Sequence, residues 1–68
     1  MKLKTRVFER YKGKYKSLSE LAWVMGIPRA QIYKVRQGKQ GINEMFITGA
    51  MKAFPECSLA ELFYIILE

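Results

Sequence analysis

The sequence contains no histidine, no aspartate and only one cysteine, Cys57. Zinc sites are built from several cysteine, histidine or acidic ligands, and histidine is the usual general base in nucleophilic catalysis. We therefore expect no zinc cluster and no histidine-based active site, and we predict that the chain is not an enzyme and needs no cofactor or small-molecule ligand. A single cysteine also excludes a disulfide within the chain and is typical of a reducing cytoplasm.

Long apolar runs are missing as well. The first four residues, Met-Lys-Leu-Lys, are basic and lack the continuous apolar stretch of a signal peptide. The apolar segment at residues 62 to 67 is shorter than the about 20 residues that cross a bilayer. We expect a soluble cytoplasmic protein without a membrane partner. A peripheral membrane protein that uses a basic helix over residues 3 to 12 is an alternative.

Positive charge is concentrated in one part of the chain. Residues 1 to 40 contain eleven of the twelve lysines and arginines and two glutamates, a net charge of +9. Residues 41 to 68 contain one lysine and four glutamates, a net charge of −3. Half of the 68 residues are hydrophobic, which predicts one folded domain over residues 1 to 68 with a small core. The basic part favours a polyanionic partner.

Residues 18 to 25 are predicted to form a two-turn helix. Ser17 precedes them and Glu20 follows three residues later, which is the spacing of a capping box, so Ser17 is the expected N-cap. At about 100° per residue, one side of this helix is apolar. That stripe consists of Leu18, Leu21, Ala22 and Met25. Gly26 stands where a left-handed residue ends a helix, so the chain is expected to turn there.

A second helix is predicted from Pro28 to Gln37. Proline suits the first helical position because its φ is already close to the helical value. Ile32 and Val35 form the inward stripe, and Gly38 ends the segment. The residues that face away from the stripe are Ala30, Tyr33, Lys34 and Gln37, and those on its flanks are Arg29, Gln31 and Arg36. The outward face is therefore polar and cationic.

Two short helices joined by a glycine turn form a helix-turn-helix. Residues 21 to 35 follow the spacing L-A-x-x-x-G-I-x-x-x-x-I-x-x-V, which resembles the Cro and phage-repressor type of domain, often called the XRE family. The resemblance extends over about residues 17 to 63. The chain departs from the family pattern at Pro28, where a serine or threonine commonly caps the second helix, and at Leu18, where the family commonly has a glutamine that contacts phosphate.

Three more helices are predicted around the motif. Apolar residues recur at helical spacing in residues 3 to 12, which predicts a first helix there, ending at Gly13. Asn43 is the expected N-cap of a fourth helix that continues to Phe54. Ser58 and Glu61 repeat the capping-box spacing before a fifth helix, about Leu59 to Tyr64. We therefore expect an all-α fold, a compact five-helix lambda-repressor-like domain.

Two apolar features have open interpretations. The tail at residues 64 to 68 begins with Tyr64, Ile65, Ile66 and Leu67, which either fold back on the core or form a homodimer contact. We favour the dimer because so small a domain gains from association. Trp23 faces away from the stripe of its helix and is expected to pack against another helix or a partner subunit.

The resemblance implies a sequence-specific regulator of transcription that binds double-stranded DNA, with the helix from Pro28 to Gln37 in the major groove. Base contacts are expected from Arg29, Ala30, Gln31, Tyr33, Lys34 and Gln37. Phosphate contacts are expected from Lys14, Lys16, Ser17, Ser19, Arg36, Lys39 and Gln40. Tyr33 either contacts a base or packs on a neighbouring side chain.

The regulator is expected to act as a repressor by occupying its site, since the chain shows no ligand-sensing or activation domain. The family resemblance adds a phage or mobile-element origin. The alternative is an adaptor or antitoxin-like module that binds a protein through its acidic part and apolar tail, with DNA contact secondary. RNA binding is less favoured, because no β-sheet with stacking aromatic residues is predicted.

Overall fold

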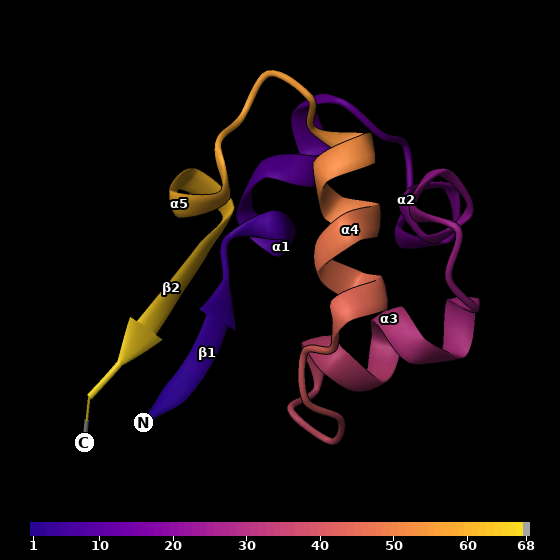
Figure 1. The fold of residues 1–68 in the computed structure, drawn as a ribbon. Coiled ribbons are helices and arrows are strands. Elements are labelled where there is room, and N and C mark those ends of the chain that lie inside the picture. Colours follow the sequence, from indigo (N-terminus) through magenta and orange to yellow (C-terminus); the bar gives the residue numbers. More distant parts are fainter. Residues whose placement is uncertain (68) are drawn as a thin grey trace.

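The computed structural model describes residues 1 to 67, which form five α-helices, one 3₁₀ turn and a two-stranded antiparallel sheet (Figure 1). The elements in chain order are β1 (Lys2–Thr5), α1 (Val7–Arg10), the 3₁₀ turn η1 (Tyr11–Gly13), α2 (Leu18–Met25), α3 (Arg29–Arg36), α4 (Glu44–Ala53), α5 (Leu59–Leu62) and β2 (Phe63–Ile66). Glu68, the last residue of the predicted apolar tail, lies outside the described residues.

The expectation of an all-α fold is wrong, because the two ends of the chain pair with each other. β1 and β2 are antiparallel, in a register that runs from Lys2 opposite Ile66 to Thr5 opposite Phe63. The aromatic and β-branched residues of β2 favour a strand. The predicted first helix is therefore shortened to α1 and η1, and the predicted fifth helix ends at Leu62 instead of Tyr64.

Hydrogen bonds fix the base of this two-stranded ribbon to the helices. The hydroxyl of Thr5 and the backbone N–H of Arg6 both donate to the carbonyl of Leu62, at 2.9 and 2.7 Å. The Thr5 hydroxyl also accepts from the backbone N–H of Val7 at 3.2 Å. The guanidinium of Arg6 lies 4.2 Å from the centre of the Tyr64 ring. The ribbon is thus anchored at α1 and α5, and its other end projects from the molecule (Figure 1).

The two helices of the motif form as predicted, with differences at their starts. The hydroxyl of Ser17 caps α2 by accepting from the backbone N–H of Glu20 at 3.1 Å. The Glu20 carboxylate accepts from the backbone N–H of Lys16 instead of that of Ser17, so the predicted reciprocal capping box at Ser17 is wrong in this half. Pro28 has an extended ψ of 142° and is the N-cap of α3, which begins at Arg29.

Glycines end both helices of the motif. Gly26 has a φ of 74° and Gly38 a φ of 77°, the left-handed conformation that glycine adopts without strain. The backbone N–H of Ile27 donates to the carbonyl of Ala22 at 3.1 Å, which closes α2 in a Schellman arrangement. The predicted turn at Gly26 is confirmed.

The caps of the later helices are also confirmed. The side chain of Asn43 accepts from the backbone N–H of Phe46 at 2.9 Å at the start of α4. Ser58 and Glu61 form both bonds of a capping box at the start of α5. These bonds join residues three apart, so the sequence spacing alone indicates them.

The core lies between α2, α3, α4 and the base of the ribbon. The largest fully buried side chains are Phe46, Phe54, Leu21, Ile32, Leu62 and Val7. The ring of Phe46 lies 6.3 Å from that of Phe8 and 6.3 Å from that of Phe63. These contacts connect α4 with α1 on one side and β2 on the other, so the ribbon and the helix-turn-helix share one core.

Candidate nucleic-acid interface

Helix α3 has one buried side and one exposed cationic side. Ile32 and Val35 have exposed fractions of 0% and 9%, which confirms the predicted inward stripe. Five of the six predicted base-contacting residues are exposed, four of them opposite the stripe and Arg29 on its flank: Arg29, Ala30, Tyr33, Lys34 and Gln37. Tyr33 is 38% exposed. A helix about 10 to 12 Å in diameter fits the major groove of B-DNA, which is about 12 Å wide.

The sixth predicted base-contacting residue, Gln31, has a partner within the protein. Its side chain is half-buried, and its Nε2 donates to Oδ1 of Asn43 at 3.3 Å. Asn43 is also the cap of α4, so this bond connects α3 to the start of α4. To reach the adenine edge expected for it, Gln31 must give up this bond.

Three of the predicted phosphate contacts lie at the start of α2. Lys16 and Ser17 are exposed and Ser19 is half-buried. The oxygen of Ser17 accepts from the helix backbone, which leaves its hydroxyl proton available to donate. The N-terminal end of a helix carries a partial positive charge and favours anions. The start of α2 therefore favours an anion, but the Glu20 carboxylate already accepts from the backbone N–H of Lys16 there, so a phosphate must bind beside it.

Lys14 is placed differently, because its ammonium group is paired. Its Nζ lies 2.9 Å from Oε1 of Glu56, near the end of α4. The hydrogen bond from Lys14 lowers the pKa of Glu56, and the same bond to Glu56 raises the pKa of Lys14. Both groups are exposed, so the pair is screened by solvent. A phosphate that binds Lys14 must compete with Glu56.

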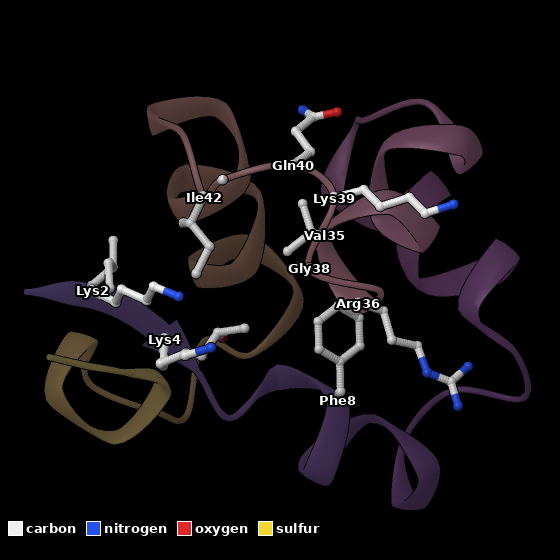
Figure 2. Close-up of a pocket in the computed structure, with 12 residues that line it drawn as sticks. Lys2, Lys4, Phe8, Val35, Arg36, Gly38, Lys39, Gln40 and Ile42 are labelled. Atoms are coloured by element: carbon white, nitrogen blue, oxygen red, sulfur yellow. The ribbon is translucent and has the colours of Figure 1, made fainter. Parts of the chain in front are cut away.

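The loop after α3 can contact phosphate only through its side chains at Lys39 and Gln40, because the backbone N–H groups of these residues are already hydrogen-bonded. The backbone N–H groups of Lys39 and Gln40 both donate to the carbonyl of Lys34, at 2.9 and 3.3 Å. The side chain of Lys39 is exposed and that of Gln40 is half-buried. Figure 2 shows that Lys39 and Arg36 extend toward the same side of the molecule. Both remain available for phosphate.

The sequence prediction did not include the lysines of β1. Lys2 and Lys4 line a hollow between β1 and the loop after α3, together with Arg36 and Lys39 (Figure 2). Lys4 belongs to the predicted helix over residues 3 to 12, whose first residues form part of β1 instead, and Lys2 directly precedes that helix. The signal in the sequence is the alternation of Lys2 and Lys4 around Leu3, which is the period of a strand.

Trp23 is the other residue whose expected environment changes. It was expected to pack against another helix or against a partner subunit. Its side chain is 83% exposed on α2, so packing against another helix of this chain is wrong. Among residues 1 to 67, no helix is long and apolar enough to cross a membrane, and no group of three acidic, histidine or cysteine residues is placed to hold a metal ion.

Comparisons with protein-family models, with curated proteins and with solved structures found no significant match for this chain.

Proposed function

We propose that the protein is a sequence-specific regulator that binds double-stranded DNA in the cytoplasm and represses by occupying its site. The observation that carries this proposal is the geometry of α3, which buries Ile32 and Val35 in the core and exposes cationic and amide side chains on the opposite side. A helix held in this way is suited to the major groove. Phosphate contacts would orient it, and base edges would select the site.

Arg29 and Lys34 are the proposed readers of guanine. Both are exposed on α3 and belong to no ion pair among the described residues, so their donors are available to the O6 and N7 acceptors. Gln37 is the proposed reader of adenine, because its side chain is exposed at the end of α3. A contact of this kind discriminates against a wrong base by about 1 to 3 kcal/mol.

The test begins with selection from random duplexes, followed by titration of the selected site. The double variant Arg29→Ala with Lys34→Ala is expected to lose at least about tenfold in affinity, because each base contact is worth about 1 to 3 kcal/mol. The matched control is Lys12→Ala with Lys52→Ala, which removes the same charge from η1 and from the end of α4. Unchanged affinity in the first variant would show that α3 is not the recognition helix, and failure to enrich any sequence would reduce the function to nonspecific binding.

A homodimer through the ribbon is the proposed assembly. Residues 1 to 67 include nine exposed large hydrophobic residues, and six of these belong to the ribbon, its flanks or α5: Met1, Leu3, Leu59, Ile65, Ile66 and Leu67. Each strand of a two-stranded ribbon has one unpaired edge, and β2 strands related by a twofold axis pair antiparallel. Two copies would then read half-sites about one helical turn apart.

The same exposed apolar residues favour the second candidate function, an adaptor or antitoxin-like module that binds another protein. Truncation after Phe63 does not separate the two functions, because it removes most of β2 and with it the pairing of β1. The substitution Ile65→Lys is suitable, since Ile65 is 57% exposed. Loss of self-association in sedimentation supports the homodimer. A monomeric wild-type protein that loses a defined heterologous partner on this substitution supports the adaptor.

A further inference from the structure

A hollow of about 570 Å³ separates β1 from the loop that follows α3. One wall is β1 and Phe8, and the other is the end of α3 and the loop to α4 (Figure 2). Its lining residues are Lys2, Leu3, Lys4, Thr5, Phe8, Val35, Arg36, Gly38, Lys39, Gln40, Gly41 and Ile42. Only Arg36, Lys39 and Gln40 of this set were expected at the DNA interface, so the β1 wall has no assigned role.

The hollow is strongly positive. Its twelve lining residues include four cations and no acidic residue. The ion pair of Lys14 with Glu56 is the only one among residues 1 to 67, so none of the four cations is neutralised there. Lys2 and Lys4 lie two residues apart and therefore share one face of β1. Figure 2 shows their ammonium groups directed toward the hollow.

The position of the hollow relates it to the recognition helix. In Figure 1, α3, the loop after it and the projecting end of the ribbon all lie along the lower side of the molecule. Arg36 belongs to α3 and also lines the hollow, so the two surfaces are continuous. A duplex that receives α3 in its major groove carries phosphates along both edges of that groove. If α3 enters the major groove, the phosphates on the side of Arg36 would lie nearest to β1.

We propose that this hollow, the β1 groove, binds the DNA backbone beside the base pairs read by α3, with Lys2 and Lys4 as phosphate donors. This inference rests on the proposed function. The cations of the groove do not converge on one point: Lys2 and Lys4 point into it, whereas Arg36 and Lys39 extend outward along the α3 side (Figure 2). Such a track suits a polyanion that passes across it better than a free phosphate ion.

The groove has a quantitative consequence. Each lysine that neutralises a phosphate of duplex DNA contributes about 0.9 to the slope of log affinity against log salt. The double variant Lys2→Gln with Lys4→Gln is therefore expected to reduce this slope by roughly two. Phosphate contacts carry no sequence information, so the selected site and a scrambled site should lose affinity by the same factor.

The matched control is Lys12→Gln with Lys52→Gln, which removes the same charge outside the groove. Fluorescence anisotropy is measured over a salt series for the wild-type protein, the groove variant and the control. A slope for the groove variant equal to that of the wild type overturns the proposal, and so does an equal loss of slope in the control. Thermal unfolding of each variant accompanies the titrations.

A second measurement keeps the test valid if the groove variant folds poorly. The wild-type protein is titrated with duplexes shortened stepwise at the flank of the selected site. The proposal requires the slope to fall by roughly two when the flanking phosphates are removed. No fall in slope at any length overturns it.

Three further outcomes distinguish a failure of the groove proposal from a failure of the function on which it rests. In the first, Arg29→Ala with Lys34→Ala abolishes specific binding while the groove variant binds like the wild type. In that case the groove proposal is wrong and the proposed function stands. If the wild-type protein does not bind duplex DNA, both fail. Saturable binding of inorganic pyrophosphate that requires Lys2 and Lys4, with no change in the DNA salt slope, assigns the groove to a free anion and overturns the proposal.

Discussion

Gly49 of α4 packs directly on the backbone of Met25 at the end of α2. A Cβ atom at position 49 would lie 2.5 Å from the carbonyl oxygen of Met25 and 2.8 Å from its Cβ. Real Cβ atoms do not approach backbone so closely, and the carbonyl of a helix end cannot move aside like the tip of a flexible side chain. This contact sets how closely the first helix of the motif approaches α4.

Gly49→Ala is therefore expected to destabilise the protein by roughly 1 to 3 kcal/mol, the usual cost of an overpacked core. The sign of the change in unfolding free energy is informative, because alanine in a helix is more stable than glycine by about 1 kcal/mol when no steric contact opposes it. The measurement is denaturant unfolding. Gly13→Ala is the control, since no atom lies within 4 Å of a Cβ there. A stabilised Gly49→Ala protein would mean that α2 and α4 are further apart.

Asn43 caps α4 through its side-chain oxygen, which substitution can remove or keep. Asn43→Ala removes the cap of α4 and is expected to cost about 1 kcal/mol in the free energy of unfolding. Asn43→Asp keeps a side-chain oxygen for the backbone N–H of Phe46, so it should retain most of this stability. An aspartate variant as unstable as the alanine variant would show that the cap bond contributes little. In both cases the unfolding free energy is measured by urea titration.

The capping box of α5 predicts a pH dependence. The backbone N–H of Ser58, followed by its hydroxyl, lowers the pKa of Glu61 in the folded protein. A carboxyl group with a lowered folded pKa adds stability above its unfolded pKa of about 4.3, and this stability is lost as the pH falls through the folded value. The wild type should exceed Glu61→Gln in melting temperature at pH 7, and the difference should shrink below pH 4. A difference that is the same at both pH values would contradict this role.

The pair of Lys14 with Glu56 predicts a gain in DNA binding on substitution. Glu56→Gln removes the partner of Lys14 and frees its ammonium group for phosphate. The slope of log affinity against log salt should rise by about 0.9, with little change in melting temperature because the pair is exposed. Glu9→Gln is the control for the charge change alone. Equal salt slopes for the Glu56 and Glu9 variants would show that Lys14 does not contact phosphate.

The prediction from sequence succeeded where the interactions join residues close along the chain. The turn at Gly26, the cap at Asn43 and the box at Ser58 each involve bonds over a few residues, and all three are present. It was wrong for the reciprocal bond at Ser17, where the Glu20 carboxylate reaches the backbone N–H of Lys16 instead. Both partners lie within the same turn, so residue types alone do not choose between them.

In the candidate interface, too, the sequence predicts the local features but not the long-range contacts. The apolar periodicity of α3 determines which side is buried, and therefore which side presents Arg29 and Lys34. The bond from Gln31 to Asn43 and the pairing of Lys14 with Glu56 join residues 12 and 42 apart. Neither partner is marked by a local pattern, because each contact depends on how the helices pack.

Neighbouring residue types are enough to predict the helix-turn-helix segments, most of their caps and the concentration of positive charge in residues 1 to 40. The sheet between the two ends of the chain depends instead on long-range packing in the folded protein. Lys2 lies opposite Ile66, and that pairing competes with a local helix only once the core has brought both ends together. The β1 groove exists for the same reason, since its two walls come from distant parts of the chain.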